Sequence, residues 1–173
     1  MAIVEDRWAP FAHRTVVVEA VRQAEVAYCA AYDRADAEAL GAMFDPGATL
    51  RRPSRDCQGW PEILGYFREL WAAGVRPTRH LPLAVDVEDV DADPLHVRVS
   101  YLLVLGRDDD LYLGWGDYDD RLVLQDGRLV FVEKVSTIQG LFHLPGGWRE
   151  GRTTSVPWSP GRVGDAGAPA GGR

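Results

Sequence analysis

The chain has 173 residues, of which 46% are hydrophobic and 26% are charged, a balance typical of a folded domain with a sizeable core. Its formal net charge of −7, without any run of basic residues, argues against nucleic acid or an anionic membrane surface as a partner. The apolar runs are too short to span a bilayer, and no secretory signal pattern opens the chain, so we expect a cytoplasmic protein with reduced cysteines.

The first part of the chain carries helical spacing. After an irregular lead-in over residues 1–13, apolar residues recur every three or four positions over 15–32, which predicts a helix. A second helix is expected after Asp36, because aspartate is a favoured N-cap residue. The sequence Asp45-Pro46-Gly47 then predicts its end.

The segment GWPEILGYFRELWAAG predicts a third helix. Pro61 suits a first helical turn, a stripe of apolar side chains follows, and Gly74 is expected to end the helix. The next part of the chain alternates apolar and polar residues, as antiparallel strands do, near 79–90, 94–106, 110–124 and 128–138.

Two glycine signals refine the strands. Asp126-Gly127 between two strands predicts a two-residue hairpin. Gly114 and Gly116 lie within a strand, where glycine usually marks a bulge, a bend or a close approach of a ligand. Helices followed by a meander predict an α+β domain, with three N-terminal helices packed against one curved, mainly antiparallel sheet.

The C-terminal end of the chain differs in composition. Beyond about residue 150 it is rich in Gly, Pro, Ala and Arg, so we expect an extension over 146–173 that is disordered from about residue 160. The folded domain is then expected over 14–145.

Several kinds of functional site are excluded by spacing. The four histidines are not spaced as metal ligands, and neither a phosphate-binding glycine loop nor a nucleophile elbow is present, so we expect no metal and no cofactor. Single polar residues on apolar elements remain. Asp33 is one of them, because it closes an apolar helix at the end where the helix dipole disfavours negative charge.

Four further residues have two interpretations each. Tyr28 and Tyr32 are one helical turn apart, and they suit either the core or a ligand-binding face. His80 lies opposite Leu81 and its apolar neighbours on a strand, so it faces either water or a mixed pocket. Lys134 lies among apolar strand residues and suits either a solvated edge strand or a functional site.

The order and spacing of several segments carry a family resemblance. AYDRADAEALGAMFDPGATLR, QGWPEILGYF, TRH and GDYDDRLVLQDGRLVFVEK together resemble the SnoaL-like branch of the nuclear transport factor 2-like superfamily. The likeness covers roughly residues 14–140. It implies a cone-shaped fold, in which a strongly bent sheet wraps around helices and encloses a deep pocket. Members of the family form dimers or trimers, which implies a homo-oligomer here.

The resemblance also implies roles for individual residues. In scytalone dehydratase and related lyases, an aspartate that ends the first long helix pairs with a histidine that opens a strand, and Asp33 and His80 match these positions. Tyr32 matches a tyrosine of scytalone dehydratase, and Tyr28 matches one of bile-acid 7α-dehydratase. Lys134 stands where lindane dehydrochlorinase has an arginine.

The sequence departs from the family at two positions. Ala84 stands where the family often has asparagine, and no clear equivalent exists for a second histidine of scytalone dehydratase. The resemblance therefore does not define the substrate.

The chemistry expected of the pair follows from the two side chains. A carboxylate that accepts a hydrogen bond from one imidazole nitrogen fixes the tautomer and leaves the other nitrogen as a base. The same carboxylate stabilises the imidazolium once the proton has arrived. Asp33 is thus expected to make His80 a better base.

We therefore expect a cofactor-independent lyase that catalyses a dehydratase-type elimination on a small, largely apolar, cyclic metabolite. His80 would remove a proton, Tyr28 or Tyr32 would donate to a carbonyl or a departing hydroxyl, and Lys134 would assist. The expected apolar and aromatic walls of the pocket are Phe44, Phe67, Trp71, Trp115, Tyr118 and Phe131.

Two alternatives remain open. The same pocket and acid–base groups would serve an isomerase or a cyclase of natural-product biosynthesis, including ring closure by epoxide opening. The superfamily also includes protein-binding members, so a non-catalytic ligand-binding or assembly domain is the second alternative. A homodimer or homotrimer is expected in each case, because a lone cone leaves the outer face of its sheet exposed.

Overall fold

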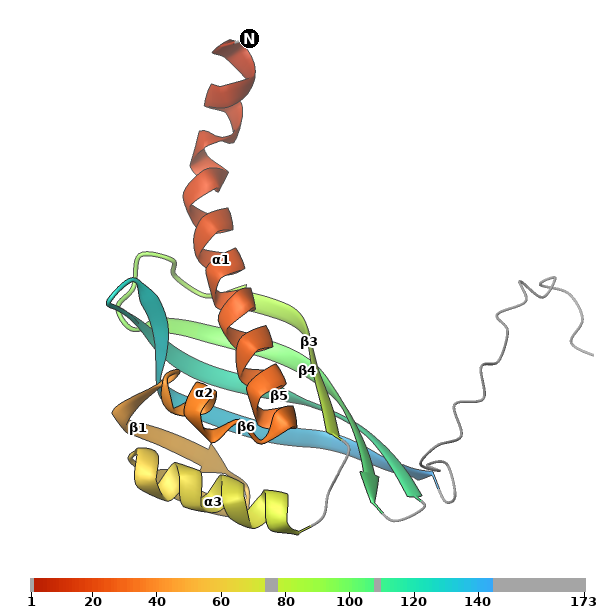
Figure 1. Cartoon of the computed structure of the whole chain (residues 1–173). Coiled ribbons are helices and arrows are strands. Elements are labelled where there is room, and N and C mark those ends of the chain that lie inside the picture. Colours follow the sequence, from red (N-terminus) through yellow and green to blue (C-terminus); the bar gives the residue numbers. More distant parts are fainter. Residues whose placement is uncertain (1, 74–77, 108–109, 145–173) are drawn as a thin grey trace, which may run out of the picture.

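The computed structural model describes residues 2–73, 78–107 and 110–144 (Figure 1). The helices are α1 (Ala2–Arg34), α2 (Ala37–Gly41) and α3 (Trp60–Ala72). The strands are β1 (Phe44–Arg52), β2 (Arg55–Gln58), β3 (Thr78–Val87), β4 (Leu95–Arg107), β5 (Asp110–Gln125) and β6 (Arg128–Leu144). The predictions for Gly74 and for the extension over 146–173 fall outside the described residues.

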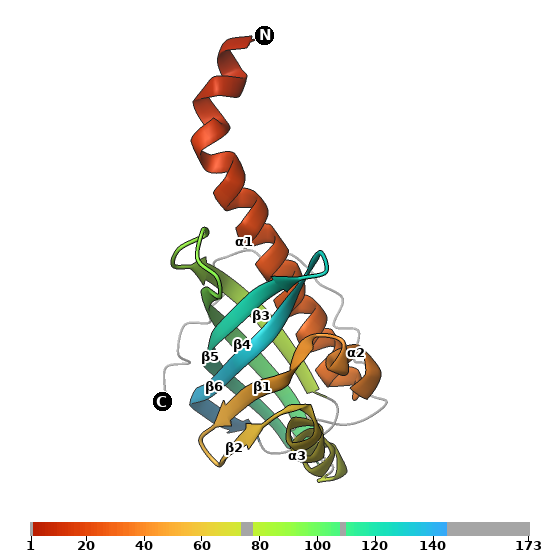
Figure 2. The same ribbon diagram turned by 90° about the vertical axis from the view of Figure 1, so that its left-hand side faces the viewer.

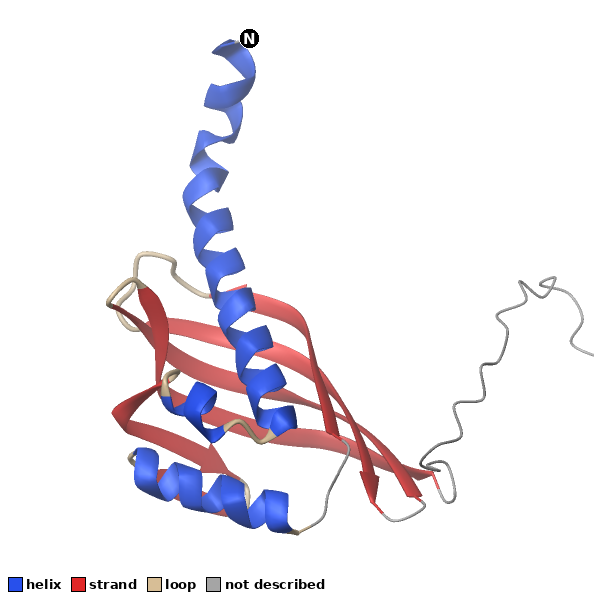
Figure 3. Cartoon of the chain, viewed as in Figure 1, coloured by secondary structure: helices blue, strands red, loops and turns tan. Residues whose placement is uncertain are grey.

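The six strands form one sheet in the order β2-β1-β6-β5-β4-β3. Strands β1 and β6 pair in parallel, and every other neighbouring pair is antiparallel. The sheet bends strongly without closing, and the helices lie on its concave side (Figures 2 and 3). The predicted α+β fold is confirmed. None of the described helices is long and apolar enough to cross a membrane.

Helix α1 is longer than the sequence predicted. It begins at Ala2, whereas an irregular lead-in was expected over residues 1–13, and its first turns project beyond the sheet (Figure 1). Pro10 lies inside this helix, where proline ordinarily destabilises, so the sequence did not indicate that the helix begins so early.

A bend at Ala35 separates the first two helices, with Asp33 before it and Asp36 after it. Ala35 adopts a left-handed conformation with φ of 55°, and the N–H of Asp36 donates to the carbonyl oxygen of Ala31 over 2.9 Å. The side chain of Asp36 then accepts from the N–H of Ala39 over 3.0 Å, which confirms the predicted N-cap of α2.

Strands β1 and β2 were not predicted. Pro46 and Gly47 indicated a turn after the second helix, but both residues lie inside β1. They are tolerated there because the pairing of β1 with β6 shifts its register between Phe44 and Thr49, where a regular ladder is interrupted. Beyond the shift, Ala48 and Leu50 alternate into the core.

Strand β3 contains a bulge that changes which residues share a face. Its pairing with β4 shifts between Pro82 and Ala84, so Leu83 is the extra residue. Leu81 and Leu83 are exposed, whereas Val87 is completely buried, although alternation placed these residues on one face. The bulge therefore allows His80, before it, and Val87, after it, to face the interior together.

Two glycine predictions can be followed in the hairpin of β5 and β6. Asp126 and Gly127 have φ of 51° and 76°, as a two-residue hairpin turn of this kind requires. The register of β5 against β6 shifts between Trp115 and Gly116, which places a bulge opposite that glycine, with Gln139 of β6 as the extra residue. A Cβ atom at Gly116 would lie 2.0 Å from the carbonyl oxygen of Thr137, so no larger residue fits there.

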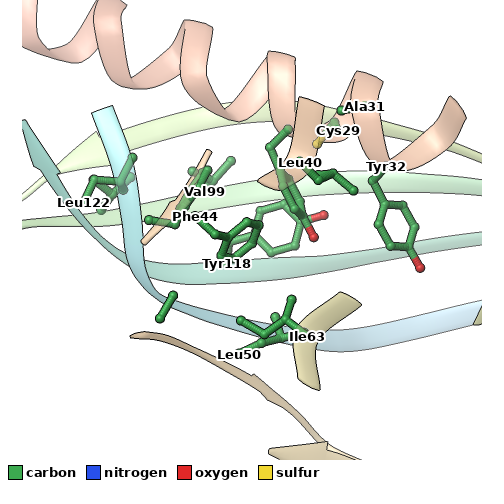
Figure 4. Close-up of a cluster of buried hydrophobic side chains, with 14 of the residues drawn as sticks. Cys29, Ala31, Tyr32, Leu40, Phe44, Leu50, Ile63, Val99, Tyr118 and Leu122 are labelled. Atoms are coloured by element: carbon green, nitrogen blue, oxygen red, sulfur yellow. The ribbon is translucent and has the colours of Figure 1, made fainter. Parts of the chain in front are cut away.

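The core lies between the helices and the concave side of the sheet (Figure 4). Phe44, Leu50 and Ile63 are at most 4% exposed and bring β1 and α3 together. Tyr32 lies at one end of the cluster in Figure 4, toward the cavity described next. The end of α1 therefore contributes a residue both to the core and to the wall of this cavity.

Candidate active site

The last turn of α1 and the start of β3 meet at Asp33 and His80. Nδ1 of His80 lies 2.7 Å from Oδ1 of Asp33, and the backbone N–H of His80 donates to Oδ2 over 2.9 Å. The side chain of Asp33 is only 4% exposed and that of His80 only 8% exposed. The hydrogen bond expected from the sequence is therefore present, and it is shielded from water.

This geometry determines the tautomer of His80. An ionised carboxylate can only accept, so Nδ1 carries the hydrogen and donates it to Asp33. Nε2 is then the nitrogen with a lone pair, and it has no hydrogen bond to the described residues. A neutral imidazole in this arrangement could act as a base through Nε2, since no described residue hydrogen-bonds to that nitrogen.

A cavity of about 310 Å³ lies beside His80. Residues from α1, β1, α3, β3, β4 and β6 contribute to its wall, together with the turn between β1 and β2. Its polar side chains are Tyr32, Arg52, Ser54, Tyr66, His80 and Ser136. Its other side chains are Pro53, Leu70, Trp71, Leu103, Leu105 and Ile138. Half of these side chains carry a polar group, but most of the surface that faces the cavity is apolar, as in most small-molecule sites.

The structure separates the two candidate tyrosines. Tyr32 lines the cavity, and its ring centroid is 5.2 Å from that of His80 at an interplanar angle of 88°. Tyr28 is 1% exposed and does not line the cavity; its hydroxyl lies 3.5 Å from a guanidinium nitrogen of Arg52. Burial also raises the pKa of Tyr28 above its ordinary value. Of these two tyrosines, Tyr32 is therefore the one at the cavity.

Lys134 is neither solvated nor part of the cavity wall. Its side chain is completely buried, and Nζ lies 2.5 Å from Asp120 and 3.1 Å from Glu25. The rings of Tyr28 and Tyr118 pack against the ammonium, with centroids 4.2 and 3.9 Å away. We expected Lys134 to assist catalysis, but it lies in the core and does not line the cavity. Two carboxylates, one from α1 and one from β5, hold the lysine there.

Burial and the neighbouring charges both shift the pKa values of Lys134 and Asp120. Burial alone would lower the pKa of Lys134, but the carboxylates of Asp120 and Glu25 raise it above its ordinary value. Burial raises the pKa of Asp120 well above the usual range, against the opposing effect of Lys134. The second carboxylate, on Glu25, raises it further.

The prediction of an aromatic cavity wall is wrong for most of its residues. Of the six residues, only Trp71 lines this cavity. Trp115 is 41% exposed and covers Gly140 beside Phe142, away from the site. The other four are buried in the core. Phe44, Tyr118 and Phe131 pack against the ring of Tyr28. Phe67 packs against Tyr32 and Trp71, two residues that line the cavity.

The sequence also missed residues that do line the cavity, Arg52 above all. Arg52 follows Ala48 and Leu50 at two-residue steps, and this alternation would have placed it on the inner face once β1 was recognised as a strand. Metal chemistry has no local support, since no group of three His, Cys, Asp or Glu side chains forms a ligand set in the described ranges.

Comparison with known proteins places the chain in a family. The model of the SnoaL-like domain matches residues 15–135. The chain therefore belongs to the SnoaL-like family, as the sequence resemblance indicated. Among curated proteins, none has a sequence that matches this chain.

Solved structures share the fold at low sequence identity. A protein assigned as a scytalone dehydratase from Novosphingobium aromaticivorans is 18% identical, with a TM-score of 0.67, over 81% of this chain and 97% of its own. The type 3 hexachlorocyclohexane dehydrochlorinase from Novosphingobium barchaimii is 15% identical, with a TM-score of 0.69, over 79% and 96%. A protein assigned as the β subunit of an aromatic-ring-hydroxylating dioxygenase from Novosphingobium aromaticivorans is 18% identical, with a TM-score of 0.64, over 73% and 92%.

Proposed function

We propose that the protein is a cofactor-independent lyase that eliminates water, or a comparable leaving group, from a small cyclic metabolite. The observation that carries the proposal is the 2.7 Å hydrogen bond of Asp33 to His80 at the wall of a cavity that Tyr32 also lines. The SnoaL-like family and the fold of a dehydrochlorinase support the reaction class by analogy.

In the proposed reaction, Nε2 of His80 takes a proton from a carbon beside a carbonyl group. The electron pair of that C–H bond forms the enolate, and the enolate then expels the hydroxyl group on the next carbon. Tyr32 donates a proton to the departing oxygen, so water leaves and a conjugated ketone remains. The imidazolium on His80 is stabilised by Asp33, and this effect is stronger in a site with little water.

A panel of β-hydroxy cyclic ketones tests the reaction, with 3-hydroxycyclohexanone and its bicyclic homologues as first members. The conjugated product absorbs in the near ultraviolet, and mass spectrometry detects the loss of one water. Elimination that wild-type protein catalyses and His80→Gln does not would support the proposal. A product of unchanged mass would identify an isomerase or a cyclase instead.

His96→Gln is the matched control. His96 also contacts two carboxylates, those of Glu88 at 2.6 Å and Asp119 at 2.8 Å, but it lies outside the cavity. Activity should therefore survive this change. Tight binding of panel members without any turnover would contradict the lyase and favour the non-catalytic ligand-binding alternative.

We also propose that the protein forms a homo-oligomer in the cytoplasm. Exposed apolar side chains support an interface, among them Leu83 at 67%, Leu141 at 50% and Phe142 at 58% exposure. Light scattering after size-exclusion chromatography measures the mass, and a monomer would contradict this proposal.

A further inference from the structure

Arg52 is a charged residue that the proposed elimination does not yet use. It is the last residue of β1 and lines the cavity, whereas its neighbour Arg51 points the opposite way. Arg51 is 56% exposed and pairs with Glu133 over 3.1 Å. Two consecutive arginines thus lie in opposite environments, one at the surface with a carboxylate and one at the cavity.

The guanidinium of Arg52 has no carboxylate partner among the described residues. Its one hydrogen bond to them is donated to the Tyr28 hydroxyl over 3.5 Å, which is at the limit of a hydrogen bond. Its Nε is buried without any hydrogen-bond partner. Because a guanidinium stays protonated in proteins, the positive charge is present and incompletely compensated.

Such an arrangement is costly without a ligand. A buried donor that loses water and gains no acceptor destabilises the folded protein, and a charged donor does so more strongly. Arg52 also stands over the ring of Tyr32, with its Cζ 5.9 Å from the centroid, but a neutral ring only partly replaces an anion. The unsatisfied group is therefore better explained by a ligand than by the fold.

A second unpaired donor lies on the same wall. Nε1 of Trp71 is buried without a hydrogen-bond partner, and Trp71 lines the cavity with Arg52. No Asp or Glu is found among the described residues of this wall, because Asp33 is turned toward His80 behind it. The cavity offers donors and a positive charge, so its complement is an acceptor that carries negative charge.

We propose that Arg52 binds an anionic oxygen of the substrate, and that the substrate is an apolar ring compound carrying a carboxylate or an enolisable carbonyl group. The apolar part of such a molecule would contact Leu70, Leu103 and Leu105. This inference rests on the proposed function for the position of the substrate beside His80. It adds the substrate class and a specificity-determining residue.

The same contact would assist the elimination. When Nε2 of His80 takes the proton, the electron pair of the broken C–H bond moves onto the carbonyl oxygen. Arg52 would face that oxyanion with a preorganised positive charge, and such donors contribute strongly in a water-poor site. When the leaving group departs, the C=O bond re-forms and the enolate electron pair becomes the new C=C bond. The electron pair of the broken C–O bond leaves with the oxygen, which Tyr32 protonates.

Binding of two small probes tests the proposal without the natural substrate. 2-Naphthoate and 2-naphthamide have nearly the same shape, but only the first is an anion at neutral pH. Isothermal titration calorimetry on the full chain should show about 10-fold tighter binding of the naphthoate, the usual worth of a hydrogen bond to a charged group. Arg52→Gln should abolish this preference, and Arg52→Lys should keep part of it.

Arg51→Gln is the matched control, because it removes a neighbouring positive charge at the surface and should leave the preference unchanged. Thermal unfolding should show Arg52→Gln to be at least as stable as wild type, since the change removes an unsatisfied charge; a clear loss of stability would point to a structural role. Equal binding of the two probes to wild type, no binding of naphthoate at millimolar concentration, or an unchanged preference in Arg52→Gln would overturn the proposal.

Comparison of His80→Gln with Arg52→Gln separates this proposal from the proposed reaction. His80→Gln should retain the preference for naphthoate, which would show that the anion is recognised by Arg52 and not by a protonated imidazole. If Arg52→Gln loses the preference but His80→Gln still turns over the ketone panel, the lyase is wrong and anion binding stands. If His80→Gln loses turnover while Arg52→Gln retains the preference, the lyase stands and this inference is wrong.

Discussion

Asp33 holds His80 by two hydrogen bonds at once, one to the ring at 2.7 Å and one to the backbone N–H at 2.9 Å. One carboxylate therefore fixes both the position of the strand residue and the orientation of its ring. The backbone bond ties the start of β3 to the end of α1, and these two elements pack against each other. Positioning of this kind is what a general base requires.

The two residues should behave as one unit in catalysis. We expect His80→Ala and Asp33→Asn each to lower turnover of a panel substrate by about 10²–10⁴-fold, the usual contribution of a positioned acid–base group. The double variant should be little worse than His80→Ala, because members of one unit are not additive. Additive losses, measured by steady-state kinetics with folding checked by circular dichroism, would contradict a shared role.

The tyrosines should separate in the same assay. Tyr32→Phe removes a hydroxyl from a cavity residue and should lower turnover by about 10²-fold if that hydroxyl donates the proton. Tyr28→Phe removes only a long contact of 3.5 Å in the core and should leave turnover within a small factor of wild type. A larger loss of turnover for Tyr28→Phe than for Tyr32→Phe would contradict the assignment of Tyr32 as the proton donor.

The sequence predicted the elements that local patterns define. The third helix, the hairpin at Asp126-Gly127 and the N-cap at Asp36 all depend on residues a few positions apart, and the structure contains each of them. Asp33 and His80 are separated by 47 positions, and the contact between them was expected only because a family resemblance supplied the pairing.

The sequence did not predict the environment of residues whose contacts come from other segments of the chain. Lys134 pairs with Glu25, 109 positions away, and with Asp120, 14 positions away on the partner strand of the hairpin. Asp120 lies opposite Lys134 only because the register shifts between Arg121 and Leu122, and regular pairing from the predicted turn places it opposite Glu133 instead. Arg52 was missed because β1 pairs in parallel with β6, at the other end of the domain, and Pro46-Gly47 indicated a turn instead. A bulge at Leu83 likewise changed the face of later β3 residues without a visible signal.

Lys134 should matter for stability more than for chemistry. Lys134→Met leaves Asp120 and Glu25 buried without their cation, and loss of one partner from a buried pair costs about 3–5 kcal/mol. Glu25 is already poorly satisfied, because its Oε1 has no hydrogen-bond partner. Urea unfolding measures the change in the free energy of unfolding.

The surface pair provides the control for this variant. Arg51→Met removes the cation that pairs with Glu133 in an exposed site, where such pairs contribute about 1 kcal/mol or less. A cost for Lys134→Met as small as that for Arg51→Met would show that the buried group is not held by its charges.

The raised pKa of Asp120 gives stability a specific pH dependence. Burial raises this pKa well above the ordinary value, so between the ordinary and the raised pKa the folded protein binds a proton that the unfolded chain releases. This contribution to stability is fully present at low pH and is lost as pH rises through the raised pKa. Urea unfolding at pH 5 and pH 7 should therefore show wild type losing stability relative to Asp120→Asn at the higher pH. An equal effect of pH on wild type and on Asp120→Asn would contradict the raised pKa, because a carboxylate with an ordinary or lowered pKa is already ionised at both pH values.

Ala35 gives the last prediction, at the bend that separates Asp33 from Asp36. Its φ of 55° lies in the left-handed region, which costs an L-residue with a Cβ atom about 1–2 kcal/mol. Glycine avoids that cost but loses more conformational entropy on folding, about 0.5–1 kcal/mol relative to alanine. Ala35→Gly should therefore raise the free energy of unfolding by up to about 1 kcal/mol. Ala39→Gly inside α2 is the control and should lower it, because Ala39 lies in a helix. Turnover should be unchanged in Ala35→Gly, since Asp33 is fixed by its own bonds to His80 rather than by the bend. Destabilisation by Ala35→Gly, measured by urea unfolding, would mean that the left-handed conformation is not adopted in solution.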